Sequence, residues 1–205
     1  MQLTLVGVVN LSQSNLQKIN QIRYWSEPIS LSDWSEILIS GPDTFNWFQR
    51  QLAQDISGIH IEGKSVVRLD RAAKVNYFGI LYQHNNDFSF YLPTVLVDNF
   101  KNDFEKFVIM EDTKIINVES NKLGLVIGKY EKGIPVDFFG EQASIVKEAK
   151  YRDKEDVYFE LLALPVWDKN IKPDVLVNET RLNDVAIDYA KGCFLGPVSY
   201  THLTL

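Results

Sequence analysis

The sequence predicts an α+β fold in which mainly antiparallel β-sheets carry helices packed on one face. Three observations predict it: short apolar segments bounded by turn residues, two segments with helical periodicity, and polar turns between successive strands. At 205 residues and 45% hydrophobic composition, the chain is long enough to bury a core and too apolar to be disordered.

Strands are expected where short apolar runs end at turn residues. The first run ends before Ser40 and Gly41, and a polar turn at residues 84–87 joins two later runs. The expected strands cover residues 34–39, 66–69, 77–83, 88–92, 114–118, 122–127 and 158–164.

Two helices have the clearest periodicity in the chain. The first is expected over residues 43–54, because Pro42 suits a first helical turn and apolar residues recur at helical spacing after it. The second is expected over residues 97–107, whose aromatic stripe predicts core packing rather than a cofactor site. A weaker helical pattern covers residues 141–150, after a turn expected at residues 133–135.

The charge balance argues against broad nucleic-acid binding. The chain has 21 basic and 27 acidic residues, for a formal net charge of −6, whereas nucleic-acid binding relies on clustered Lys and Arg. The most basic stretch, residues 147–154, is interrupted by Glu148 and Asp153 and is typical of a solvated mixed face. We therefore expect no direct, tight binding to nucleic acid.

Targeting and redox features favour the cytoplasm. The first residues lack the basic cluster of a secretory signal, and no apolar run is long enough to span a membrane. A single cysteine cannot form an internal disulfide, which fits a reducing compartment. We expect a cytoplasmic protein that does not bind membranes.

Common catalytic and metal-binding motifs are absent from the sequence. It has no phosphate-binding P-loop, no dinucleotide-binding glycine pattern and no His-Glu-x-x-His pair. His60, His84 and His202 are far apart, and Cys193 has no second thiolate, so no metal site is expected. A Ser-His-Asp site stays open as an alternative, although no nucleophile elbow supports it.

Polar residues on and after the first helix form one candidate site. They are Gln49, Gln51 and Asp55. Because Gln51 and Asp55 lie four residues apart, they would share a helical face and could contact one polar ligand together. A solvated helix face is the alternative.

The second candidate site lies near the C-terminal end of the sequence. Glu179, Lys191 and Cys193 stand there among apolar residues. Cys193 lies between Gly192 and Gly196, and backbone without a Cβ can turn tightly and approach a ligand closely. Lys191 could favour the reactive thiolate. The alternative is that the cysteine is a small buried hydrophobic residue.

Two separated blocks resemble motifs of the YgfZ family, folate-binding proteins similar to the T-protein (aminomethyltransferase) of the glycine cleavage system. Residues 191–196 resemble the start of its Lys-Gly-Cys-[Tyr/Phe]-x-Gly-Gln-Glu signature, and residues 187–189 resemble the Ile-Ser-Phe that leads into it. The earlier block comprises residues 31–34, 41–43 and 49–55. These resemble the family's Asp-Trp, Gly-x-Asp and Gln-Gly-Gln-x-Thr-x-Asp motifs.

The resemblance implies an aminomethyltransferase-like folate-binding fold and a tetrahydrofolate-type cofactor. Trp34 matches a tryptophan that faces folate. Cys193 matches a thiol thought to matter for work on iron–sulfur clusters, with Lys191 beside it as a second catalytic candidate. The implied partners are iron–sulfur enzymes or their assembly proteins, including enzymes that thiolate tRNA. The residues implied in folate binding are Trp34, Gln49, Gln51, Asp55, Asp70, Glu179, Gly192 and Gly196.

The implied function is folate-dependent support of iron–sulfur cluster assembly or repair, and through it of tRNA modification. The alternative is a folate-dependent aminomethyl or methyl transferase, which needs a carboxylate near the folate nitrogen. Asp70 or Glu179 would serve there. A non-catalytic interaction fragment is the third reading. The resemblance also implies a folate-binding subdomain at residues 1–119 and a second α+β subdomain at residues 120–196.

The sequence departs from the family pattern in both blocks and between them, beginning with Arg50 and Ala53, which replace the expected glycine and threonine. Ala72 and Ala73 stand where relatives often have lysine and glycine. Because alanine resists positive φ, we expect a different turn there. After Gly196, residues 197–205 replace the expected Gln-Glu and resemble non-native sequence. We therefore expect the C-terminal β-barrel of the family to be missing.

Overall fold

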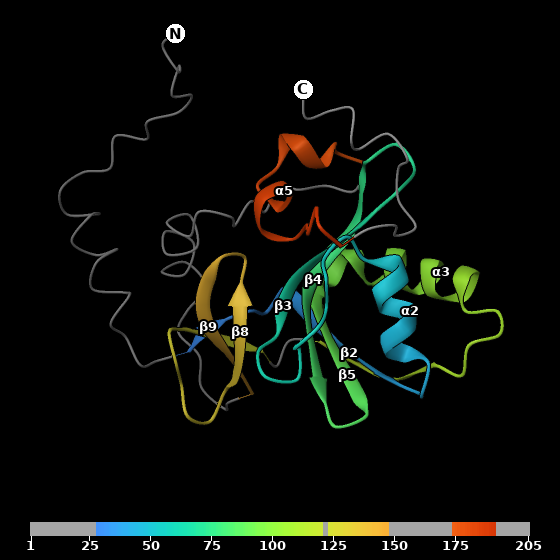
Figure 1. The fold of residues 1–205 in the computed structure, drawn as a ribbon. Coiled ribbons are helices and arrows are strands. Elements are labelled where there is room, and N and C mark those ends of the chain that lie inside the picture. The colour runs from blue at the N-terminus through green and yellow to red at the C-terminus, as the bar shows by residue number, and fades with distance from the viewer. Residues whose placement is uncertain (1–27, 121–122, 148–173, 192–205) are drawn as a thin grey trace, which may run out of the picture.

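Antiparallel β-sheets dominate the fold. The computed structural model describes residues 28–120, 123–147 and 174–191 (Figure 1). The five-stranded sheet, in its order, consists of β3 (Lys64–Leu69), β4 (Val75–His84), β5 (Asp87–Pro93), β2 (Trp34–Ser40) and β6 (Lys114–Ser120). The four-stranded sheet consists of β1 (Ile29–Ser30), β7 (Gly124–Ile127), β9 (Glu141–Val146) and β8 (Ile134–Phe138). Neighbouring strands pair antiparallel throughout these two sheets, which confirms the expected architecture.

Helices cover one face of the five-stranded sheet (Figure 1). They are α2 (Thr44–Gln51), the 3₁₀ turn η1 (Thr94–Leu96) and α3 (Val97–Phe107). The aromatic stripe of α3 is core, as predicted: the Phe100 ring centroid lies 5.2 Å from that of Phe90 on β5 and 6.3 Å from that of Phe48 on α2. Such ring contacts stabilise the core beyond simple burial. Among the described residues, no helix is both long and apolar enough to cross a membrane.

The other face of the five-stranded sheet packs against β8 and the turn that follows it. The Trp34 ring centroid lies 5.5 Å from that of Phe138 and 6.2 Å from that of Phe139. Ser65 Oγ on β3 donates to the carbonyl of Asp137 at 2.7 Å and accepts from the amide of Phe139 at 2.6 Å. These contacts join the two sheets around a buried aromatic cluster.

The structure corrects two expectations about the second sheet. The helix expected at residues 141–150 is wrong, because Glu141–Val146 form β9, which pairs with both β7 and β8. Pairing on both sides overrides the helical preference of this segment. The turn expected at residues 133–135 is shorter, since Pro135 already belongs to β8, an edge strand where proline is tolerated. The strand expected at residues 158–164 lies outside the described residues.

Strand β1 crosses the expected division of the chain into subdomains. It precedes β2 in the sequence, yet it pairs with β7 in the four-stranded sheet. The boundary between residues 119 and 120 therefore stays a prediction.

Candidate functional site

The turn that follows α2 forms the centre of the candidate site. The helix ends at Gln51, earlier than expected, because Leu52 already has an extended backbone with φ −93° and ψ 152°. The amide of Ala53 then donates to the carbonyl of Val67 on β3 at 2.9 Å, which ties the turn to the sheet. Gln51 and Asp55 therefore do not share a helical face, and that prediction is wrong.

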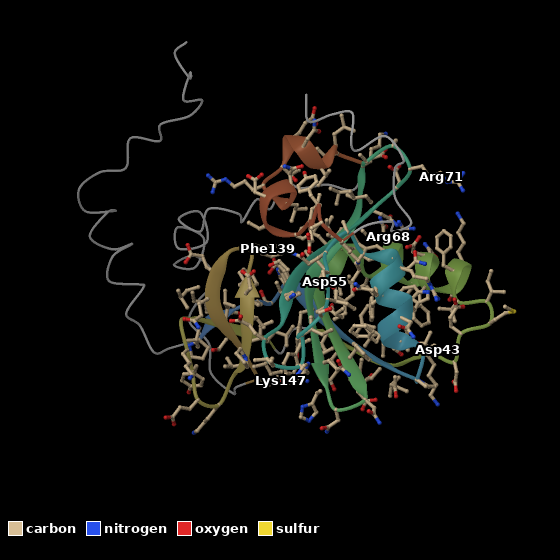
Figure 2. All side chains as sticks on the ribbon, viewed as in Figure 1. Asp43, Asp55, Arg68, Arg71, Phe139 and Lys147 are labelled. Carbon is tan, nitrogen blue, oxygen red and sulfur yellow. The ribbon has the colours of Figure 1, made fainter. Side chains whose placement is uncertain are left out.

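Gln49 and Asp55 meet through a direct hydrogen bond (Asp55 is labelled in Figure 2). Gln49 Nε2 donates to Asp55 Oδ1 at 2.9 Å, and Gln49 Oε1 accepts from the amide of Ile56 at 3.1 Å. Asp55 Oδ1 also accepts from the amide and the hydroxyl of Ser57, at 3.2 and 2.9 Å. The bond from Gln49 is the main cause that lowers the pKa of Asp55, with burial opposing it. The turn thus presents an ionised, hydrogen-bonded carboxylate.

Gln51 lies apart from this pair, because its side chain turns into the protein. It is 2% exposed, and among the described residues its Oε1 has no hydrogen-bond partner. A buried carbonyl oxygen without a partner costs about 1–3 kcal/mol. The role of Gln51 in ligand binding stays a prediction.

Lys191 anchors a late segment of the chain to the same turn. Its Nζ donates to the carbonyls of Leu52 and Gln54, each at 2.7 Å. The amide of Asp188 donates to the carbonyl of Ala53 at 3.1 Å. The Lys191 contacts span 139 and 137 residues of sequence. Lys191 of the second candidate site therefore lies against the turn that holds the first candidate site.

The Lys191 ammonium is half-buried and rests on neutral acceptors. Burial lowers the pKa of Lys191 to about 8, while the charges of Asp55 and Asp188 act in the opposite direction. The short helix α5 (Leu182–Val185) precedes this segment, and Gln54 Nε2 donates to the Val185 carbonyl at 3.3 Å. The role of Lys191 as a catalytic residue stays a prediction.

Asp70 and Glu179 lie at the turn between β3 and β4 instead. Asp70 Oδ1 accepts from the amides of Ala72 and Lys74 at 2.8 and 2.9 Å, so this carboxylate shapes the turn. The segment η2 (Val177–Glu179) pairs with the turn through its backbone, and Glu179 is exposed. The folate-binding roles of Asp70 and Glu179 stay predictions.

The backbone of this turn contradicts one expectation. Ala73 has a φ of 62°, although we expected alanine to avoid a positive φ here. An alanine in this conformation costs about 1–2 kcal/mol. Two hydrogen bonds hold it there: its amide donates to the Asp70 carbonyl at 3.2 Å, and its carbonyl accepts from the Val177 amide at 3.0 Å.

The remaining predicted site residues are either buried or outside the described part of the chain. Trp34 is fully buried between the two sheets, and its role as a folate-facing residue stays a prediction. Gly192, Cys193 and Gly196 lie outside the described residues, as do residues 197–205. The reactive-thiol assignment therefore also stays a prediction.

Sequence reasoning missed an ion pair between Glu36 and Lys147 (Figure 2 labels Lys147). Glu36 is 7% exposed on β2, and its Oε2 pairs with Lys147 Nζ. The sequence did carry a signal for this pair, because Glu36 is the one charged residue of β2, whose other residues are apolar or serine. The acceptors of Lys191 had no such signal, since they are backbone carbonyls.

Comparisons with solved structures find similarities to this chain. No protein-family model matches the chain, and no curated protein matches it. The chain is similar to the crystal structure of the glycine cleavage system aminomethyltransferase T from Bartonella henselae, with a TM-score of 0.48 and 12% identity. The similarity covers 64% of this chain and 44% of that protein, so the chain spans less than half of its length.

Proposed function

We propose that this protein binds tetrahydrofolate or a derivative and supports the assembly or repair of iron–sulfur clusters, and thereby tRNA modification. The observation that carries the proposal is the anchoring of Lys191 on the carbonyls of Leu52 and Gln54. That contact joins residues 49–55 to the segment that leads into residues 191–196. Residues 49–55 belong to one block that resembles YgfZ motifs, and Lys191 is the first residue of the other, so its contact with this turn supports a shared site.

The chemistry of the turn suits a folate-like ligand. An ammonium group has three N–H donors, and the bonds that Lys191 makes within the described residues leave one of them for an acceptor on the ligand. A carboxylate of the folate glutamyl tail or a pterin carbonyl would accept it. The ionised carboxylate of Asp55, held by Gln49 and Ser57, would accept from the N–H groups of the pterin.

In this proposal, the anchored lysine also serves the signature thiol. Cys193 follows Lys191 by two residues in the sequence. A nearby ammonium favours the thiolate, which is the form of cysteine that binds metals and reacts. The thiolate would then act as a transient ligand for iron of a cluster in transfer or repair.

Equilibrium binding of tetrahydrofolate, measured by calorimetry without oxygen, tests the site. We expect saturable binding to the wild-type chain and about tenfold weaker binding to Lys191→Met, because a hydrogen bond to a charged group is lost. Lys132→Met is the matched control, since Lys132 is an exposed lysine outside this turn. No saturable binding to the wild-type chain, or equal affinity in Lys191→Met, would contradict the proposal.

The accessory role needs a separate test in cells. We expect Cys193→Ser to reduce the activity of iron–sulfur enzymes that thiolate tRNA, while tetrahydrofolate affinity stays within about twofold. Unchanged thiolation would contradict the accessory role. Formation of methylenetetrahydrofolate from an aminomethyl-lipoyl carrier by the purified chain would favour the transferase alternative instead.

A further inference from the structure

A pocket separate from the proposed folate site lies where β2, β6 and the end of β9 meet. Its volume is about 110 Å³. Side chains alternate along β2, so Glu36 shares a sheet face with Trp34, which packs against the second sheet. The lining residues are Glu36, Leu38, Asn117, Glu119 and Lys147.

The carboxylate of Glu36 is the most buried charge of this pocket. The residue is 7% exposed. Ser89 Oγ donates to its Oε1 at 2.8 Å, and Lys147 Nζ pairs with its Oε2. A buried carboxylate is costly unless it is paired and hydrogen-bonded. Here the ammonium of Lys147 provides the pairing charge, although its own side chain is 48% exposed.

A second carboxylate faces the same ammonium. The β2–β6 register places Glu119 directly opposite Glu36, an arrangement of like charges that destabilises a sheet. Lys147 Nζ lies 3.8 Å from Glu119 Oε2. One ammonium therefore serves two carboxylates, and the pocket lining keeps an excess of negative charge.

A buried tyrosine lies beside Glu36 on the neighbouring strand. Tyr91 on β5 lies directly opposite Glu36 in the strand register and is fully buried. Its hydroxyl has no hydrogen-bond partner within the part of the chain that the structure describes. Burial and the neighbouring charge of Glu36 raise the pKa of Tyr91, so this hydroxyl stays neutral and adds no charge beside the carboxylate.

We infer that this pocket binds a small organic cation through its primary ammonium group. The two carboxylates would receive the ammonium, and the side chain of Leu38 would contact its alkyl part. The pocket has room for such a group, since its volume of about 110 Å³ exceeds the ~30 Å³ share of one water. In the free protein the Lys147 ammonium lies between the two carboxylates. Because its side chain is half-exposed, a ligand ammonium can displace it.

Calorimetric titration of the full chain with n-butylammonium tests this inference. 1-Butanol serves as the uncharged probe of similar size. We expect saturable binding of the cation and none of the alcohol. Glu119→Gln should weaken the binding about tenfold, because a charged hydrogen-bond partner is lost. Glu131→Gln is the matched control, since Glu131 is an exposed glutamate outside the pocket. Its affinity should equal that of the wild-type chain.

A second variant tests whether the ammonium of Lys147 competes with the ligand for the two carboxylates. Lys147→Met removes the competing ammonium and should bind n-butylammonium more tightly than the wild-type chain. The inference is overturned if neither chain binds the cation saturably, or if 1-butanol binds equally well. It is also overturned if Glu119→Gln binds as tightly as the wild-type chain, or if Mg²⁺ binds the pocket in place of the cation.

Discussion

Two lysines fasten late segments of the chain to elements formed early in the sequence, and they use different partners. Lys191 donates to the backbone carbonyls of the turn after α2. Lys147 pairs with Glu36 on β2 and lies 3.8 Å from Glu119 on β6. One contact is a hydrogen-bonded anchor on neutral atoms, and the other is an ion pair with a buried carboxylate.

The difference shows how the partner determines the free-energy penalty of burying a lysine ammonium. Two carbonyls accept from the ammonium of Lys191 but carry no compensating charge, so burial lowers its pKa to about 8. The carboxylate of Glu36 does compensate the charge of Lys147, yet it is itself buried. Loss of Lys147 therefore leaves the buried carboxylate of Glu36 without its pairing charge, whereas loss of Lys191 leaves only two neutral carbonyls without a donor.

The largest effect is expected from breaking the ion pair. Lys147→Met should lower the free energy of unfolding by about 2 kcal/mol, less than for a fully buried pair because Lys147 is half-exposed. Urea denaturation measures it. The double variant Glu36→Gln with Lys147→Met should recover part of the loss, since no charge is then left buried. A loss equal to that of the exposed control Lys132→Met would contradict the description of this pair.

The anchor of Lys191 predicts a pH dependence. Its pKa of about 8 lies below the 10.5 of an ordinary lysine, so between these values the unfolded chain binds more protons than the folded one. The cost of burying the ammonium is fully present below pH 8 and is relieved as the pH rises towards 10.5. The free energy of unfolding of the wild-type chain should therefore rise through this window relative to Lys191→Met. A flat or falling difference in urea denaturation would refute the lowered pKa.

The smallest effect is expected at the second carboxylate of the pocket. Glu119 is 42% exposed, and its oxygen lies 3.8 Å from Lys147 Nζ. Such partly exposed pairs contribute little, so Glu119→Gln should change the free energy of unfolding by less than about 0.5 kcal/mol. A loss comparable to that of Lys147→Met would show that Glu119, rather than Glu36, is the main partner of the lysine.

Periodicity predicted the elements whose patterns are local. The aromatic stripe of α3 lies where helical spacing indicated, and strands β2, β4 and β5 lie where short apolar runs between turn residues indicated. The helix predicted at residues 141–150 is wrong, because pairing with β7 and β8 determines the conformation of β9 more than its own sequence does. The early end of α2 also depends on tertiary contacts, since Ala53 bonds to Val67.

Three residues that meet at the turn after α2 could be picked from the sequence, but their contacts could not. The polar residues Gln49, Asp55 and Lys191 were selected from the sequence. Their arrangement was not, because Lys191 binds backbone carbonyls more than a hundred residues away, which carry no side-chain signal. Glu36 was detectable in principle as a charge within an apolar strand, but a single charged residue does not identify its partner.

The location of folate binding tests the central claim most directly. Amide hydrogen exchange of the full chain, measured with and without tetrahydrofolate, reports which backbone amides a ligand protects. We predict slower exchange at residues 52–57 and 182–191 when tetrahydrofolate is bound, with no change at residues 114–119 beside the second pocket. Saturable binding without protection at residues 52–57 and 182–191 would contradict the claim that these two segments form the folate site.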